Sequence, residues 1–343
     1  MLRKSLIPIG IFLTFGLWTG PVFPDVHRSS DFGWTAGQDV TSQFSAKLTS
    51  GFFYPGDELI LDHTYQISGS HQLPSDFTLS GDQGAGFDVT DMTSTSNHTF
   101  LQLGNRTALR NLTINYLNTP PLGPAGTNPT RGTDFYPATG IAASNKGDIV
   151  IENCRFVGSI STHVRLNNTP RPLISGTHMQ GGYWTNYLSG NVTDAVYENC
   201  VIEQYQGDGI KTVRGGNGTQ DALVDNCVFQ DGGRDGIDTT GGWKNSTVRN
   251  TIFRRLFSGM DIKSGYEDIY DVLSGLSNTG ILIEDSVFTD TGGVVLSTID
   301  RGYYTSGQHL LNTTNCHELA PHDIDINNSV FEVTTHQNGR MLH

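Results

Sequence analysis

The chain of 343 residues is poor in charge, because Asp, Glu, Lys and Arg make up only 16% of it. This share is far too low for a coiled coil or for a highly charged disordered tail. The charges that are present comprise 21 basic and 34 acidic side chains, which give a net charge of −13. An acidic protein repels phosphate backbones, so we expect no nucleic-acid partner.

Cysteine is also scarce, with four residues, no C-x-x-C and no Cys/His spacing that suits a metal site. Three of them, Cys154, Cys200 and Cys227, occupy one position of the repeat described below, so we expect them in the core. Two interpretations stay open: a stack of reduced thiols, or a disulfide between Cys200 and Cys227, as an exported protein would allow.

Long apolar runs are missing beyond the N-terminus, where residues 1–19 join a basic start (Arg3, Lys4) to about fifteen mostly apolar residues. This is the layout of a secretory signal rather than of a spanning helix. We therefore expect residues 1–24 to be a signal peptide or an N-terminal anchor, and residues 25–343 to form one domain. The expected location is extracellular or periplasmic, with no stable membrane insertion beyond that segment.

Internal repetition is what the chain has in abundance. Seven fragments share a small residue at the third position and a bulky apolar residue two positions later, and each alternates apolar and polar residues as a half-buried strand does. Their third positions follow at spacings of 23, 23, 27, 24, 35 and 43 residues. The fragments are ENCRF (152–156), SGTHM (175–179), ENCVI (198–202), DNCVF (225–229), RNTIF (249–253), EDSVF (284–288) and NNSVF (327–331).

A unit of about 23 residues with two or three short strands and no helix is typical of a parallel β-solenoid. Successive coils stack about 4.8 Å apart, so equivalent residues form ladders. A β-sandwich, the alternative, gives no reason for such columns. We expect a turn ladder joined from coil to coil by side-chain amides, made of Asn153, Asn199, Asn226, Asn250 and Asn328, with Asp285 in place of one member.

The segment before the repeats predicts how the solenoid begins. Residues 40–50 have the pattern of a short amphipathic helix, and 58–68 and 75–81 the pattern of strands, so the helix is placed to cap the first coil. The stretch GDELILDHTYQISGSHQLPSDFTLSGDQGAG resembles the entry coils of the pectate lyase and polygalacturonase superfamily. With the repeats, the resemblance covers about 300 residues. It implies an all-β protein, a single right-handed parallel β-helix with a short N-terminal capping helix.

Candidate chemistry lies on one outer face of this solenoid. In the aligned segments THVRLN (162–167), GDGIKT (207–212), RDGIDT (234–239) and SGMDIKS (258–264), an inward apolar residue is followed by an outward polar one. On adjacent coils these outward groups would lie within about 5–10 Å of one another. The side chains expected on this face are Arg165, Asp208, Lys211, Asp235, Asp238, Asp261 and Lys263.

Two interpretations of this face remain open. Hard oxygen ligands on a rigid face are typical of Ca²⁺ sites, and a cation there could hold a substrate carboxylate and acidify the adjacent C–H bond. Lys211 or Lys263 could then remove the proton, with Arg165 counted in the same catalytic set. The other interpretation is a ladder of alternating surface charges, Lys211 to Asp238 and Asp261 to Lys263, worth about 0–1 kcal/mol per pair. The expected Ca²⁺ ligands are Asp208, Asp235, Asp238 and Asp261.

The coil RDGIDT followed by GMDIKSG resembles the D-G-x-D coil of family-nine polysaccharide lyases. The resemblance implies β-elimination on a uronic-acid polysaccharide, an aspartate-bound Ca²⁺ and a lysine base. It carries the ligand role to Asp235 and Asp238, and to Asp208 as a third. Arg234 stands where that family has another Asp.

Three alternatives to a lyase remain. The same stretch resembles polygalacturonase hydrolases, but Phe257 and Ser258 stand where these carry an Asp pair, which leaves Asp235 with Asp261 for acid–base hydrolysis. The sequence APHD (320–323) resembles the D-P-H-D motif of mannuronan C5-epimerases. A non-catalytic adhesin or carbohydrate-binding β-helix is the third alternative.

Aromatic and basic side chains near the charged column predict substrate contacts, since sugar rings stack on aromatic faces. The longest insertions, near 264–280 and 299–322, are expected to form loops beside the same face. The sequence thus predicts a secreted lyase with Ca²⁺ as cofactor and an acidic, pectate- or alginate-like polysaccharide as partner. The expected substrate-binding residues are Trp184, Tyr187, Arg234 and Arg301.

Overall fold

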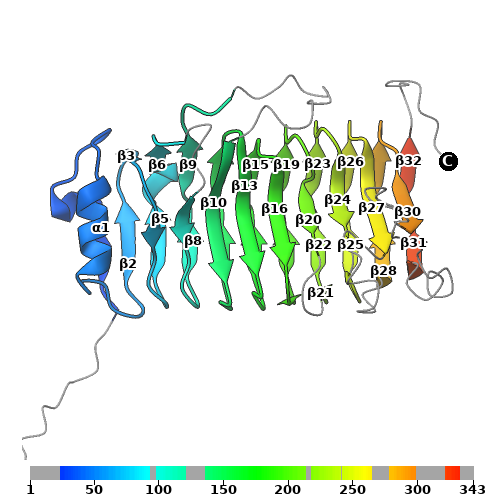
Figure 1. The fold of residues 1–343 in the computed structure, drawn as a ribbon, viewed down its shortest axis with the longest axis horizontal. Coiled ribbons are helices and arrows are strands. Elements are labelled where there is room, and N and C mark those ends of the chain that lie inside the picture. Colours follow the sequence, from blue (N-terminus) through cyan, green and yellow to red (C-terminus); the bar gives the residue numbers. More distant parts are fainter. Residues whose placement is uncertain are drawn as a thin grey trace, which may run out of the picture.

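The computed structural model describes residues 24–92, 98–120, 136–213, 218–240, 242–264, 278–298 and 321–332. Within these ranges the strands pair in parallel and stack along one axis, so the predicted all-β parallel β-helix is confirmed (Figure 1). The expected signal segment, Arg301, Cys316 and most of the two long insertions lie outside the described residues. None of the helices described is both long enough and apolar enough to span a bilayer.

Three parallel sheets, here called A, B and C, run the length of the described structure. Sheet A holds β1 (Val26–Arg28), β2 (Glu58–Leu61), β5 (Thr78–Gly81), β8 (Ala108–Arg110), β11 (Val150–Glu152), β14 (Leu173–Ser175), β18 (Val196–Glu198), β22 (Leu223–Asp225), β25 (Thr247–Arg249), β28 (Thr279–Glu284) and β31 (His322–Asn327). Sheet B holds β3 (Tyr65–Ile67), β6 (Gly86–Val89), β9 (Thr113–Tyr116), β12 (Arg155–Val157), β15 (His178–Gln180), β19 (Val201–Glu203), β23 (Val228–Gln230), β26 (Ile252–Arg254), β29 (Val287–Thr289) and β32 (Val330–Glu332).

Sheet C carries the charged face. It holds β4 (His71–Gln72), β7 (Thr99–Gln102), β10 (Tyr136–Ser144), β13 (Ile160–Asn167), β16 (Trp184–Ser189), β20 (Ile210–Thr212), β24 (Asp235–Thr239), β27 (Ser258–Ser264) and β30 (Val294–Thr298). A separate short pair joins β17 (Val192–Thr193) to β21 (Thr219–Gln220).

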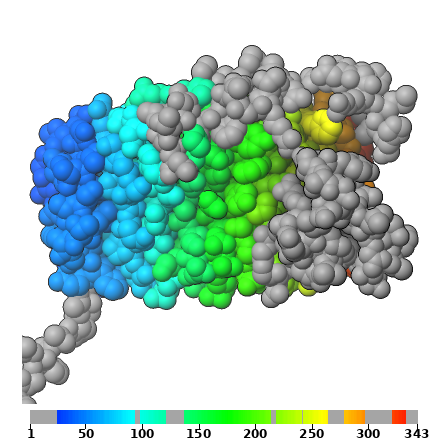
Figure 2. Space-filling model, in the orientation of Figure 1, coloured from blue at the N-terminus to red at the C-terminus, as the bar shows by residue number. Residues whose placement is uncertain are grey.

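Each full coil passes through sheets A, B and C in turn, as β11, β12 and β13 do. The colours in Figure 2 follow one another along the axis, so each coil packs against its neighbours in the sequence. The register holds equivalent residues opposite each other: Phe156 faces Met179 in sheet B, and Ile151 faces Ile174 in sheet A. The repeat therefore sets the register.

The bulky residues of the fragments form the ladder that the repeat predicts, buried in the core from Phe156 to Phe288 and 49% exposed at Phe331. Phe229, Phe253, Phe288 and Phe331 stack with nearly parallel rings, and successive ring centroids lie 5.1, 4.8 and 4.7 Å apart. These spacings equal the distance between neighbouring strands, so one large aromatic fits each coil.

The turn from sheet A to sheet B explains the recurring asparagine. Asn199, Asn226 and Asn250 adopt φ angles between 50° and 55°, a left-handed conformation that asparagine tolerates well. The amide of Asn226 donates to Asn199 at 2.7 Å, but that of Asn250 donates to Asp225 at 2.9 Å. On another coil Gly176 takes the turn with φ 54°. The expected amide ladder is therefore confirmed between Asn199 and Asn226 and between Asp285 and Asn328, and it is interrupted at Gly176 and where Asn250 donates to Asp225 instead.

The small third residue of each fragment points into the core. Cys154, Cys200 and Cys227 are buried and free, so the interpretation as reduced thiols holds in this structure. Cys200 Sγ lies 3.3 Å from the carbonyl oxygen of Ile174, which satisfies the weak thiol donor.

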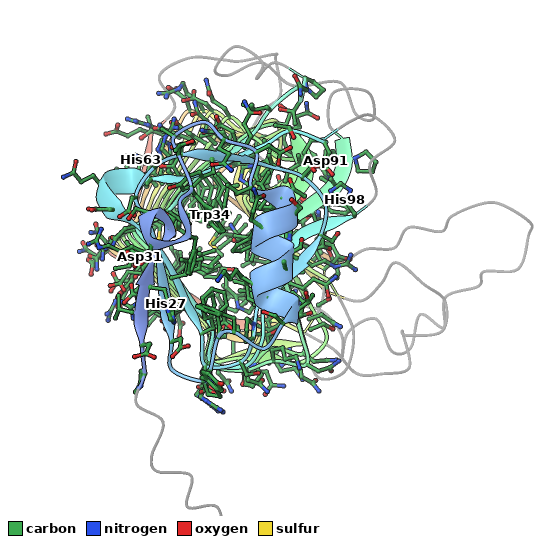
Figure 3. All side chains as sticks on the ribbon, turned by 90° about the vertical axis from the view of Figure 1, so that its left-hand side faces the viewer. His27, Asp31, Trp34, His63, Asp91 and His98 are labelled. Carbon is green, nitrogen blue, oxygen red and sulfur yellow. The ribbon has the colours of Figure 1, made fainter. Side chains whose placement is uncertain are left out.

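The N-terminal end is closed as predicted. Helix α1 (Thr41–Thr49) lies across the end of the solenoid, and Figure 3, which looks along the solenoid axis, shows it in front of the coils. The 3₁₀ helix η1 (Ser29–Phe32) precedes it in the chain. The one buried residue of α1, Phe44, packs against Phe87 at 5.4 Å and Trp34 at 6.3 Å between ring centroids. A second short 3₁₀ helix, η2, spans Asp82–Gly84. The helix thus covers apolar groups that the first coil would otherwise expose.

Candidate active site

Three consecutive strands of sheet C begin with the same four-residue pattern: Asp208 to Lys211, Asp235 to Asp238, and Ser258 to Asp261. The second residue of the pattern is glycine each time. A Cβ on Gly236 would lie 2.5 Å from the ring of Phe253 and 2.5 Å from a backbone carbonyl oxygen. Only glycine lets the chain pass this close to the phenylalanine stack. The glycine that the core requires therefore lies between the polar residues of the outer face.

The register of sheet C confirms the outward column that the alignment predicts. Lys211 lies opposite Asp238, and Asp238 opposite Asp261, while Asp235 lies opposite Ser258. The preceding residues Val164, Ile210, Ile237 and Met260 are all buried in the core. One strand step separates each pair of neighbours, a distance of about 4.8 Å.

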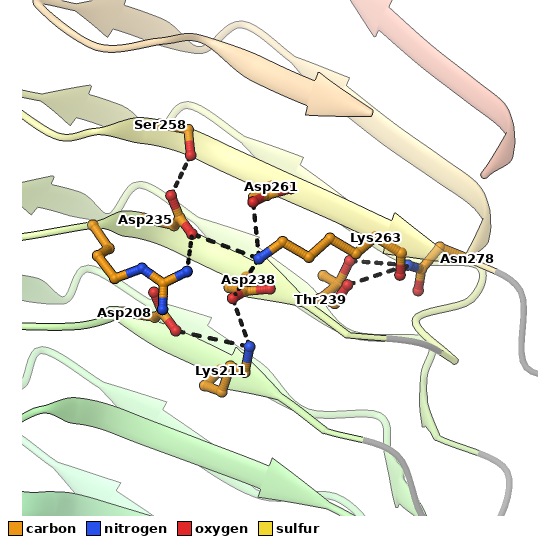
Figure 4. A network of polar contacts seen from close by, with 10 residues as sticks. Asp208, Lys211, Asp235, Asp238, Thr239, Ser258, Asp261, Lys263 and Asn278 are labelled. Atoms are coloured by element: carbon orange, nitrogen blue, oxygen red, sulfur yellow. Dashed lines mark hydrogen bonds and ion pairs between the residues drawn. The ribbon is translucent and has the colours of Figure 1, made fainter. Parts of the chain in front are cut away.

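Asp238 is the centre of the cluster (Figure 4). Its Oδ2 lies 2.6 Å from the Nζ of Lys211 and 2.9 Å from the Nζ of Lys263, and Lys263 also pairs with Asp261 at 2.8 Å. Asp238 is 0% exposed, Lys211 5% and Lys263 7%. The interpretation as a solvated surface ladder is therefore wrong for these residues, because the charges are buried.

Two further aspartates complete the centre. Asp208 lies 3.9 Å from the Nζ of Lys211, and Asp235 lies 4.0 Å from both Lys263 and Arg234. The hydroxyl of Ser258 donates to Asp235 Oδ1. With three basic groups beside four carboxylates, the cluster keeps an excess of one formal negative charge.

The donor set fits a hard cation. One oxygen from each of Asp208, Asp235 and Asp238 lies within 4.8 Å of the others. Among the residues that the structure describes, both oxygens of Asp208, Oδ2 of Asp235 and Oδ1 of Asp238 are buried and have no hydrogen-bond partner. Oxygens that bind one Ca²⁺ at about 2.3–2.6 Å are separated by at most about 5 Å, as these are. Asp261, the fourth predicted ligand, falls outside this trio and pairs with Lys263 instead.

Burial and neighbouring charges give the three carboxyl groups different pKa values. Burial, together with the charges of Asp238 and Asp235, raises the pKa of Asp208 to about 8. Burial and Asp238 raise the pKa of Asp235 to about 6. Burial acts in the same direction on Asp238, but Lys211 and Lys263 outweigh it and hold its pKa below the usual value. Asp238 is thus the strongest acid of the three and Asp208 the weakest.

The carboxylates also fix Lys263 as a cation. Burial alone would lower the pKa of Lys263, but Asp238, Asp261 and Asp235 outweigh burial and raise it. The strand end that carries Lys263 is clamped by Asn278, whose amide donates to the Lys263 carbonyl at 2.6 Å and to Thr239 Oγ1 at 3.0 Å (Figure 4).

Two members of this network were missed in the sequence. Ser258 had a signal, since it occupies the position of Asp208 and Asp235 in the repeated pattern. Asn278 had none, because it belongs to the next coil and reaches β27 only through the stacking of the solenoid.

The remaining predicted residues form a second group. Arg165 is two strands away from Lys211, so it does not join the lysines as predicted. Its guanidinium lies 5.3 Å from the ring centroid of Tyr187, which lies 5.2 Å from the ring of Trp184. Arg234, by contrast, reaches the aspartates and is 28% exposed at its side chain. Arg301 lies outside the described residues.

Known structures share this architecture at low sequence identity. PfbA, a surface adhesin of Streptococcus pneumoniae, aligns with a TM-score of 0.62 at 11% identity over 92% of this chain and 82% of that one. The polygalacturonase of Erwinia carotovora ssp. carotovora gives 0.63 at 13% over 92% and 94%. The alginate lyase of Paenibacillus sp. str. FPU-7 gives 0.53 at 11% over 91% and 99%. These likenesses show the fold.

None of the curated proteins matches the sequence. A family model described as right-handed β-helix region matches residues 82–265, which is more than half of the chain and includes the whole Asp–Lys cluster. The chain therefore belongs to the family of right-handed parallel β-helix proteins.

Proposed function

We propose that this protein is an exported lyase that cleaves a uronic-acid polysaccharide, pectate- or alginate-like, by β-elimination at the Asp–Lys cluster. One observation carries the proposal: three buried aspartates with oxygens within 4.8 Å of one another adjoin two lysine ammonium groups. The apolar N-terminal segment supports export.

Asp208, Asp235 and Asp238 would hold a Ca²⁺ ion, since their partnerless oxygens match its preference for hard ligands. When bound, the ion would supply Lewis acidity toward the substrate carboxylate and so acidify the C–H bond beside it. Arg234 adds a fixed cation that attracts the acidic chain despite the net charge of −13.

Lys211 is the better candidate for the base. Lys263 has two carboxylate oxygens within 2.9 Å of its Nζ, and its raised pKa keeps it charged, whereas Lys211 has one such partner. A base must present its amine nitrogen to the C–H bond, and Lys211 has one close carboxylate to leave where Lys263 has two. Lys263 then serves as a permanent cation.

The reaction balances with these groups. The neutral amine of Lys211 takes the proton from C5 of the uronate, and the C–H electron pair forms the C4–C5 double bond. The glycosidic oxygen leaves C4 with its bonding pair and takes a proton from water, and the hydroxide that remains takes the proton from Lys211, which restores the neutral amine and the water molecule. The products are a reducing chain end and an unsaturated uronate, and no water is added across the bond.

A hydrolase is the second candidate, and the different pKa values of Asp208 and Asp238 support it. Asp208, with a pKa of about 8, is protonated at pH 7 and can donate a proton, while Asp238 is ionised and can activate water. This pair suits acid–base hydrolysis better than the pair of Asp235 and Asp261 expected from the sequence, because Ser258 already engages Asp235.

Mass spectrometry of the products separates the candidates. We expect the wild-type protein to release oligouronides lighter by one water than hydrolysis products. The variant Lys211→Gln should bind the glycan but release nothing, while Lys146→Gln, a matched change in the turn between β10 and β11, should act like wild type. Products with the mass expected of hydrolysis would contradict the lyase and show that the protein is a hydrolase. Binding without products of either mass would favour an adhesin-like role.

A further inference from the structure

Arg165, Trp184 and Tyr187 form an outward group on sheet C apart from the Asp–Lys cluster. Arg165 is exposed on β13, and Tyr187 lies opposite it on β16. The planes of Tyr187 and Trp184 are inclined by only 37°. Trp184 Nε1 is buried and lacks a hydrogen-bond partner among the described residues. The group therefore offers an exposed guanidinium beside two half-buried aromatic rings.

This group lies in register with the reaction centre. Arg165, Tyr187, Lys211 and Asp238 occupy successive strands of one outward column. With strands about 4.8 Å apart, Arg165 is about 10 Å from Lys211 along the axis. One strand step is comparable to the length of one sugar unit, so a glycan laid along the axis would place different units at the two groups.

The column is asymmetric about the cluster. Toward the N-terminus it offers the guanidinium and rings of this group, whereas the described residue that follows Asp261 in the column is Val295, which is 37% exposed. An acidic unit gains a charge partner on the first side and none from Val295 on the second. Among the described residues of this column, the group on the N-terminal side is therefore the one that offers a charge partner to a carboxylate.

We propose that Arg165, Trp184 and Tyr187 form a subsite that binds one uronate unit of the polysaccharide, two strands N-terminal to Lys211. This rests on the proposed function, of which it specifies the substrate contacts. The guanidinium pairs with the uronate carboxylate through two parallel hydrogen bonds. The aromatic faces pack on the C–H face of the sugar ring. The glycan therefore runs parallel to the solenoid axis.

The test is calorimetric binding of polygalacturonate and alginate, with chelator present so that the Asp site contributes no metal. We expect Arg165→Gln to raise the Kd about 10- to 100-fold for whichever glycan the wild type binds, the loss typical of one charge-assisted contact. The matched control is Arg155→Gln, which changes an exposed arginine of the same coil that faces outward from sheet B. Melting temperatures check that both variants fold.

Methyl-esterified pectin provides the chemical control. Its neutral units cannot pair with a guanidinium, so the effect of Arg165→Gln should shrink on it. An equal effect on esterified and free polymer would overturn carboxylate recognition, and so would Arg165→Gln binding as tightly as Arg155→Gln. Failure of the wild type to bind either acidic glycan would also overturn the subsite. The proposed function fails separately, if the wild type releases no unsaturated product.

Discussion

Removing the carboxylate at the centre of the cluster should destabilise the solenoid strongly. Asp238 is the shared partner of two lysines that are at most 7% exposed, at 2.6 and 2.9 Å. In the variant Asp238→Asn both ammonium groups lose this charge, and among the described carboxylates Lys211 keeps Asp208, at 3.9 Å. Stranding a buried charge costs about 3–5 kcal/mol of unfolding free energy, and this is the loss that we expect.

Asp261→Asn is the matched control. Lys263 keeps Asp238 in this variant, and the side chain of Asp261 is 13% exposed, so the expected loss is about 1 kcal/mol or less. The double variant Asp238→Asn with Lys211→Met should recover part of the stability, because it no longer strands that ammonium group.

Urea unfolding of the four proteins at one pH checks the prediction through the shift in midpoint, followed by far-ultraviolet circular dichroism and by tryptophan fluorescence. Two probes are needed because solenoids can unfold in parts. Equal midpoints for Asp238→Asn and Asp261→Asn would refute the reasoning that burial of the shared pair controls stability. A double variant less stable than Asp238→Asn would refute it as well.

Two further predictions concern the core. Phe253→Ala should lower the unfolding free energy by about 3–5 kcal/mol in urea, because the ring is 0% exposed in the stack, whereas Phe257→Ala, at a ring 51% exposed, should lower it by far less; equal losses would contradict the stack. Burial lowers the pKa of His163 from 6.5 to about 4, so the unfolded chain alone gains this proton between those pH values. Stability should therefore fall by about 3 kcal/mol from pH 7 to pH 4 on this account, and His163→Gln should show a midpoint that falls less over the same range; parallel pH profiles would contradict it.

The fold was predictable because one physical constraint repeats in every coil. A small residue at the turn and a bulky residue two positions later, as in Cys227 and Phe229, must recur wherever coils stack at the strand spacing. The same reasoning missed the coil with Leu112 and Ile114, because its third residue is not small, although both are buried in the same core. The pairing register of the strands therefore follows from the repeated pattern. A coil whose third residue is large, as Leu112 is, does not match the pattern and is not recognised.

The site was predictable only where it shared the period of the coils. Asp208, Lys211, Asp235 and Asp238 were found because they sit at equivalent places of consecutive strands. The pairs Lys211–Asp238 and Asp261–Lys263, expected in the surface-ladder interpretation, are both present. Their burial and the second contact of Lys263, with Asp238, could not be predicted, since an alignment gives neither side-chain reach nor exposure. For the same reason Arg165 was grouped with the lysines, although strand β16 lies between it and Lys211.

The most direct test of the lyase is ultraviolet absorbance during incubation of the wild-type protein with polygalacturonate and with alginate. The elimination creates a C4–C5 double bond conjugated to the carboxylate, which absorbs where the intact glycan does not. We expect absorbance to rise on one of the two with Ca²⁺, and the rise to stop with chelator and resume when Ca²⁺ is restored. New reducing ends without any rise in absorbance would contradict the account.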